Sequence, residues 1–187
     1  MTEYEFTLKF NLQNAQADPQ EYVELLGRNG CDDALIGIGQ RGRIAFSFIR
    51  ESTSAYEAVL SAIEDIREVL PKARLVEAAP DLVGLTEIAE LLGFTRQNMR
   101  KLMIRAGATF PAPVRDGKPT IWHLSQILVW MNKTRKYEID EALIDIAKTN
   151  MEVNLAIEIQ DLDTKSLQRI LPPDSDMAGT ASNTLRP

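Results

Sequence analysis

The sequence has little of what disulfide frameworks, metal centres and membrane spans require. It contains one cysteine, Cys31, and one histidine, His123, so we expect neither an internal disulfide nor a zinc or iron–sulfur site built only from protein ligands. No apolar run approaches the roughly 18 residues of a transmembrane helix. The N-terminal stretch MTEYEFTLKF has no basic start before an apolar block, which argues against a secretory signal. These absences favour a cytoplasmic protein that does not enter a membrane.

The chain also lacks the residue clusters that catalysis usually requires. It has no serine nucleophile motif and no cluster of His, Cys and Asp. A nuclease would need several acidic metal ligands in its basic region, but residues 84–136 offer only Glu87, Glu90 and Asp116. We interpret His123 as a packed side chain and Cys31 as a buried thiol. The sequence therefore predicts no enzymatic activity, no cofactor and no bound metal.

The net charge of −6 conceals a strongly uneven distribution of charge along the chain. Residues 1–83 contain 8 Lys/Arg and 14 Asp/Glu, and residues 137–187 contain 4 and 10, so each flank carries −6. Residues 84–136 contain 9 Lys/Arg and 3 Asp/Glu, which gives +6. Because attraction to a polyanion depends on the local potential, this basic middle favours nucleic acid as a partner.

The first 80 residues alternate between strand and helix patterns. Apolar spacing, capping residues and turn signals predict a strand at 4–12, a helix from Asp18 to Gly27 or Gly30, two strands around Gln40-Arg41-Gly42, a helix from Ser52 or Ser54 to Leu70, and a strand at 73–80. This order is that of the ferredoxin-like split βαβ fold. We therefore expect a ferredoxin-like domain over residues 1–80, from which no function follows directly.

Residues 84–107, GLTEIAELLGFTRQNMRKLMIRAG, contain two apolar stripes separated by a turn. Gly93 suits the turn, and the hydroxyl of Thr95 can cap the second helix by accepting a hydrogen bond from a backbone N–H near Asn98. Helical spacing directs the apolar residues of this second helix inward: Met99, Leu102 and Met103. The polar residues then lie on its outer sides: Arg96, Gln97, Asn98, Arg100, Lys101 and Arg105.

A proline-containing loop and a third helix follow this pair. The turn at Asp116-Gly117 predicts a small β-hairpin with Arg115 and Lys118 beside its tip, and apolar spacing predicts a helix at about 124–131. Helix, turn, helix, hairpin, helix is the order of a winged helix-turn-helix. We expect this domain over residues 84–136, with helix 96–106 in the major groove of DNA.

The residue types of the second helix suit contacts to bases and phosphates. Gln and Asn can contact adenine and Arg can contact guanine, and the positions nearest the helix start are best placed for base edges. Basic residues farther along the helix suit the groove margin or phosphates, and the hairpin could reach a neighbouring minor groove. The predicted DNA-binding residues are Thr95, Arg96, Gln97, Asn98, Arg100, Lys101, Arg105, Arg115 and Lys118. The competing interpretation is a merely solvated basic face.

Three segments resemble the excisionase and MerR-type DNA-binding domain, especially its small phage AlpA-like regulators: LTEIAELLGFTRQNMRKL, FPAPVRDGKPTIWHL and SQILVWM. The resemblance covers residues 84–131 only. It implies sequence-specific binding of double-stranded DNA, usually as a dimer or a cooperative array, in regulation or recombination. The acidic N-terminal domain lies outside the resemblance, since the minimal family members lack it.

The C-terminal quarter is expected to extend this domain. Residues 137–171 are predicted to be a helical extension, with one helix at 138–149, an ambiguous stretch at 154–162 that fits either a strand or a helix, and a short helix at 164–171. Residues 172–187 have little to bury and are expected to be a disordered tail.

The sequence as a whole predicts an α+β protein that binds double-stranded DNA as a sequence-specific regulator, either a transcriptional repressor or autoregulator or an excisionase-like factor. We expect a homodimer or higher oligomer, with room for a protein partner at the N-terminal domain. The alternative is a protein-interaction module, in which the acidic N-terminal domain binds a basic partner as antitoxins do, or mimics DNA. A ligand-sensing domain is a third hypothesis, although no residues specify a ligand.

Overall fold

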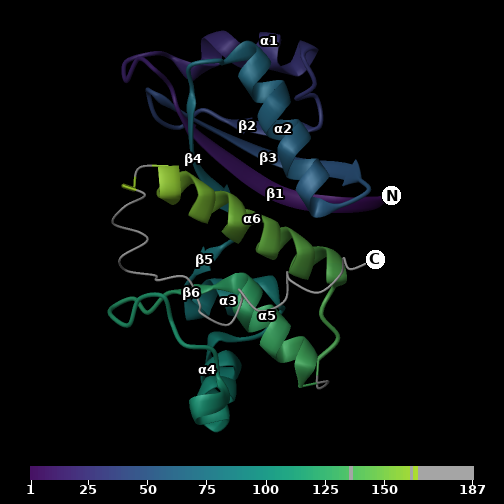
Figure 1. Ribbon diagram of the computed structural model, residues 1–187, viewed down its shortest axis with the longest axis vertical. Coiled ribbons are helices and arrows are strands. Elements are labelled where there is room, and N and C mark those ends of the chain that lie inside the picture. The colour runs from purple at the N-terminus through teal and green to yellow at the C-terminus, as the bar shows by residue number, and fades with distance from the viewer. Residues whose placement is uncertain (135–136, 161, 164–187) are drawn as a thin grey trace, which may run out of the picture.

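The computed structural model describes residues 1–134, 137–160 and 162–163, and shows a mixed α+β protein. The elements are, in chain order, β1 (Thr2–Asn11), the 3₁₀ helix η1 (Pro19–Tyr22), α1 (Val23–Arg28), β2 (Ala34–Gly37), β3 (Arg43–Ser52), α2 (Ala55–Val69), β4 (Arg74–Ala79), β5 (Leu82–Val83), α3 (Leu85–Leu91), α4 (Arg96–Ala106), the 3₁₀ helix η2 (Gly107–Thr109), β6 (Trp122–His123), α5 (Leu124–Lys133) and α6 (Glu141–Gln160). Figure 1 shows the four-stranded sheet with α1 and α2 in the upper half, α3 to α5 in the lower half, and α6 between the halves.

The upper half is built on an antiparallel sheet with the strand order β2-β3-β1-β4. β1 and β3 pair along their whole length, from Thr2 opposite Ser52 to Asn11 opposite Arg43. Every second side chain is buried from Tyr4 to Phe10 in β1 and from Ile44 to Phe48 in β3, because successive residues of a strand point to opposite faces. The predicted order of strands and helices in residues 1–80 is confirmed, although the first helix begins as a 3₁₀ turn.

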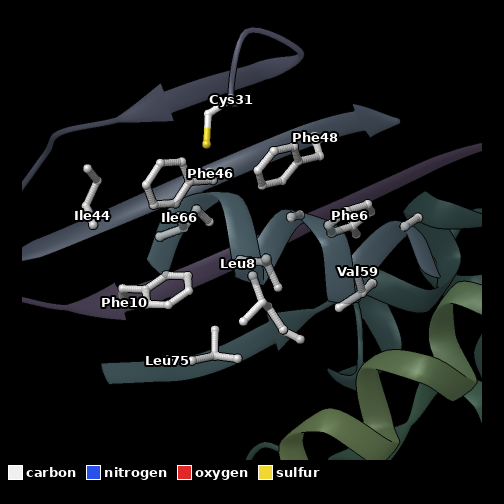
Figure 2. Packing of buried hydrophobic residues seen from close by; sticks show 14 of the residues in the cluster. Phe6, Leu8, Phe10, Cys31, Ile44, Phe46, Phe48, Val59, Ile66 and Leu75 are labelled. Atoms are coloured by element: carbon white, nitrogen blue, oxygen red, sulfur yellow. The ribbon is translucent and has the colours of Figure 1, made fainter. Parts of the chain in front are cut away.

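Phenylalanine rings fill the space between this sheet and α2, as Figure 2 shows. The rings of Phe6 and Phe48 are stacked with their centroids 5.2 Å apart, and Phe10 meets Phe46 edge to face at 5.9 Å. Leu8 completes the layer and is fully buried. Buried aromatic rings contribute large apolar areas, so this layer holds the upper half together.

An ion-pair network closes one end of this core. The Arg50 guanidinium donates to Asp33 Oδ2 at 2.6 Å, to Asp65 Oδ2 at 2.9 Å and to the carbonyl of Gly30 at 2.8 Å. Gly30 has φ of +88°, and a Cβ there would lie 2.8 Å from the Asp65 carboxyl carbon. Cys31 beside it is 1% exposed, and burial together with the Asp65 carboxylate raises the pKa of its thiol from 9.0 to about 11. The prediction of a buried thiol is confirmed.

α6 lies between the two halves and packs on both. Ile146 belongs to the core of the sheet, whereas Ile144 and Ala147 belong to the core around α3 and α5. The stretch that the sequence left open between strand and helix is helical through Gln160. Residues 141–160 are therefore helical, as expected for the extension, and form a central element of the molecule. The predicted helix at 164–171 and the predicted tail at 172–187 lie outside the described residues.

A buried carboxylate ties the junction of the halves to α6. Asp81 is 3% exposed, and its Oδ1 lies 2.7 Å from Nδ1 of His123 while its Oδ2 accepts from Asn154 Nδ2 at 2.8 Å. The Asn154 amide also pairs with the backbone N–H and C=O of Ala78, both at 2.8 Å, at the edge of β4. His123 is thus a packed side chain, as predicted. Among the described residues, no helix has the length and apolar character to cross a bilayer.

Candidate nucleic-acid interface

The turn between α3 and α4 is fixed by backbone hydrogen bonds that end α3. Phe94 N–H donates to the carbonyl of Ala89 at 2.7 Å, and Gly93 N–H donates to that of Glu90 at 3.1 Å. This pair of bonds is a Schellman motif, which needs a left-handed residue at its turn. Gly93 provides it, with φ of +66°. The chain therefore leaves α3 in one defined direction.

α4 begins as the sequence predicted. Thr95 Oγ1 accepts a hydrogen bond from the backbone N–H of Asn98 at 3.2 Å, which confirms the predicted N-cap. Met99 is fully buried, and Leu102 and Met103 are half-buried beside it. The inward stripe is therefore confirmed, and it fixes which face of α4 points to water.

The outer face of α4 is basic and exposed. Six predicted contact residues of the helix are exposed: Arg96, Gln97, Asn98, Arg100, Lys101 and Arg105. Within the described part of the chain, none of the four basic residues among them forms an ion pair, and α4 contains no acidic residue. In Figure 1, α4 lies at the end of the molecule opposite the sheet. Among the described residues, its positive charge is thus presented outward without an ion-pair partner.

A hollow lies along each side of α4. One has a volume of about 410 Å³ and is lined by Leu85, Arg96, Gln97, Arg100 and Met103. The other has a volume of about 240 Å³ and is lined by Phe94, Asn98, Lys101, Leu102, Arg105 and Tyr137. The two hollows share no lining residue, so the outer face of α4 between them stands out as a ridge. We call this face the α4 ridge, and its residues are Gln97, Arg100, Lys101 and Ile104.

The predicted hairpin is present only in a minimal form. Arg115 and Ile121 exchange two backbone hydrogen bonds of 3.2 and 3.0 Å, and they form an isolated bridge rather than a ladder. Prolines at 111, 113 and 119 lack the N–H that a longer ladder needs. The next two residues, Trp122 and His123, form β6 and pair with β5.

Aromatic contacts anchor the loop that carries this bridge. Trp122 Nε1 donates to the carbonyl of Pro111 at 3.1 Å, and Phe110 meets the rings of Trp122 and Trp130 edge to face. Arg115 and Lys118 are exposed beyond this anchor. In Figure 1 the loop projects sideways from the lower half, apart from α4. The structure thus gathers Thr95 and the six α4 residues on one surface, and places Arg115 and Lys118 on a second.

Two residues at this surface were missed by the sequence interpretation. Ile104 is 64% exposed on α4, three and seven residues after Lys101 and Gln97. Tyr137 lines one hollow, and its ring meets Phe94 edge to face at 5.5 Å. Helical spacing was the signal that could have found Ile104, since it lies opposite the buried stripe. Tyr137 is 39 residues from its hollow neighbour Asn98 in the chain, and no local pattern relates the two.

In the described ranges, no group of three or more His, Cys, Asp and Glu side chains is arranged to hold a metal ion. Comparison with known proteins found no matching family model, no matching curated protein and no matching solved structure. The function therefore has to be inferred from the α4 ridge itself.

Proposed function

We propose that this protein is a sequence-specific, double-stranded DNA-binding regulator that inserts α4 into the major groove. The observation that carries the proposal is the α4 ridge, an exposed basic helix face without an acidic residue and with a hollow on each side. A helix with its side chains is about 10–12 Å across, and the major groove is about 12 Å wide. The hollows beside the ridge would leave room for the two sugar-phosphate backbones that border the groove.

The finer fold description belongs to this proposal. The antiparallel order β2-β3-β1-β4 supports a ferredoxin-like description of the upper half. The succession of α3, turn, α4, loop and α5 supports a winged helix-turn-helix, with a wing shortened to the bridge between Arg115 and Ile121. In this description α3 braces α4, and the short wing contributes Arg115 and Lys118 to neighbouring phosphates.

Positions around α4 assign a role to each side chain. Gln97 and Lys101 lie four residues apart, on the part of the helix farthest from Met99, and would face the base edges. Arg96 and Arg100 line one hollow and Asn98 and Arg105 line the other. These four would meet the two backbones or the outer base edges. Phosphate contacts fix the register of the helix, and base contacts supply the sequence preference.

A single α4 covers only a few base pairs, so we propose that the protein acts as a dimer. Two copies would place their α4 helices in successive major grooves, about 34–36 Å apart along the duplex. Such a dimer would act in the cytoplasm. It would control transcription as a repressor or an autoregulator, or recombination as an excisionase-like factor. Its operator would contain two related half-sites.

The second candidate function is a protein-interaction module, and the open face of the sheet favours it. Leu35, Ile49 and Val76 are 78%, 57% and 40% exposed in β2, β3 and β4. Exposed apolar residues on one sheet face suit a protein partner or a second copy of the chain. The exposed positions of β1 and β3 carry no aromatic ring, so the stacking of single-stranded RNA bases finds no support there.

A selection from randomised duplexes separates the two functions. We expect the full chain to enrich one duplex motif, and the double variant Arg100→Ala/Lys101→Ala to bind it at least ten-fold more weakly. The matched control is Arg28→Ala/Lys72→Ala, which removes the same charge from exposed positions outside α4. We expect the control to bind within two-fold of the parent chain. Equal losses in both variants, or no enrichment of any duplex, would contradict DNA reading by α4.

A further inference from the structure

Ile104 is an apolar side chain on a charged surface. It is 64% exposed, and it follows Lys101 by three residues and Gln97 by seven, so all three share one face of α4. It lines neither of the two hollows beside the helix. Ile104 therefore belongs to the α4 ridge and lies toward the C-terminal end of the helix.

The surroundings of Ile104 do not suit a protein partner. Protein interfaces form around contiguous apolar patches, whereas the nearest side chains on the same face of α4 are Gln97, Arg100, Lys101 and Arg105, all exposed and polar. A protein partner that covered Ile104 would therefore also have to cover the cations beside it. The charged groups of Arg100, Lys101 and Arg105 would then lie at the protein–protein interface.

The major groove of DNA offers a matching partner. Its floor carries hydrogen-bonding groups at every base pair and one kind of apolar group, the C5-methyl of thymine. The α4 ridge carries both kinds of partner for these groups. Its polar side chains are the amide of Gln97 and the cations of Arg100 and Lys101, and its aliphatic side chain is Ile104. The polar members can meet base edges and phosphates, while the aliphatic one can meet only a methyl group favourably.

We propose that Ile104 is a specificity-determining residue that contacts the C5-methyl group of a thymine in the bound site. This inference rests on the proposed function, because it needs α4 in the major groove. It adds one property to that function, a preference for thymine over cytosine at one position of each half-site. Burying one methyl-sized group against an aliphatic side chain changes affinity by about three- to five-fold.

The test removes the methyl group from the DNA and the side chain from the protein. The duplex enriched from a randomised pool by the full chain is resynthesised with deoxyuridine in place of each thymine in turn, which deletes the methyl and leaves the hydrogen-bonding groups. We expect one thymine per half-site whose replacement weakens binding by the full chain about three- to five-fold. The same replacement should change binding by the Ile104→Ala variant less than 1.5-fold.

Two controls separate this contact from general weakening. Lys101→Ala should bind all duplexes more weakly, yet keep the response to deoxyuridine at that thymine. Ile104→Ala is expected to fold, because its side chain is exposed on a helix and alanine favours helices. Equal responses of the full chain and Ile104→Ala at every thymine would overturn the inference and leave the proposed function standing. The absence of any enriched duplex would overturn both.

Discussion

α2 and α4 are both amphipathic helices that begin at a hydroxyl cap, but the molecule holds them very differently. α2 buries six side chains along its length, namely Ala55, Ala58, Val59, Ala62, Ile63 and Ile66. α4 buries one, Met99, and packs mainly against α3. α2 therefore uses its surface to build the core of the sheet, whereas α4 leaves most of its surface for a contact outside the molecule.

The exposed faces of α2 and α4 also differ in charge. The exposed side of α2 carries Glu57, Glu64 and Glu68 beside one cation, Arg67, so its net negative charge would repel a polyanion. The exposed side of α4 carries cations and no carboxylate. A net charge of −6 thus says little about DNA binding, since the local charge of the contacting face decides attraction. The comparison predicts large effects on stability at α2 and the sheet, and large effects on binding at α4.

The largest expected effect on stability is at the aromatic layer under α2. Phe46→Ala should lower the free energy of unfolding by about 3–5 kcal/mol, because it removes a fully buried ring that contacts Phe10 and Phe48. Urea denaturation followed by circular dichroism measures this change. Ile104→Ala is the control on an exposed site and should stay within about 0.5 kcal/mol of the parent chain. A loss of less than about 1 kcal/mol for Phe46→Ala would contradict the claim that the aromatic layer under α2 dominates stability.

A smaller loss is expected at the buried residue of α4. Met99→Ala should lower the free energy of unfolding by about 2 kcal/mol, at the low end for a buried methionine, because the half-buried Leu102 and Met103 can close over the space. It should also weaken duplex binding, since α4 would lose its fixed position on α3. Stability and affinity measured on one preparation check both parts. Unchanged affinity would show that the packing of Met99 does not position the ridge.

The buried thiol beside the sheet also predicts a change of stability with pH. The buried thiol of Cys31 has a pKa raised to about 11, so the folded state favours the protonated form. This stabilisation is complete below the unfolded pKa near 9 and is lost as the pH rises toward 11. The loss should amount to about 2–3 kcal/mol. Unfolding curves between pH 8 and pH 11 measure it.

Cys31→Ser provides the control for this titration, because it keeps a small side chain and removes the thiol that titrates. Its free energy of unfolding should vary less steeply with pH over the same interval. Parallel curves for the two proteins would show that Cys31 does not carry the effect.

Much of the fold could be predicted from local patterns, because its boundaries coincide with residues of strong conformational preference. Asp18 accepts from Gln20 N–H, and Ser54 accepts from Glu57 N–H, at the helix starts where the sequence expected them. Thr95 does the same for α4, and Gly93 provides the left-handed turn before it. These features depend on a few neighbouring residues, so a single sequence contains the information for them.

The missed features depend on contacts between distant parts of the chain. α6 has no single apolar face because it packs on both halves, through Ile146 on one side and Ile144 on the other, so its sequence pattern does not show its central position. β5 has only two residues and owes its existence to pairing with β6. Ile104 is a different case, because the helical spacing that directs Met99 inward already places it on the outer face, where it is 64% exposed.

The salt dependence of duplex affinity tests the central claim most directly. If about five cations per protomer meet phosphates, the logarithm of the association constant should fall by about 4 to 5 per unit of log salt concentration. The double variant Arg100→Ala/Arg105→Ala should reduce this slope by about two, because both side chains are placed at the sugar-phosphate backbones. The Arg28→Ala/Lys72→Ala control should keep the full slope. A slope that both double variants reduce equally, or that neither reduces, would contradict the account that the α4 ridge is the surface that meets DNA.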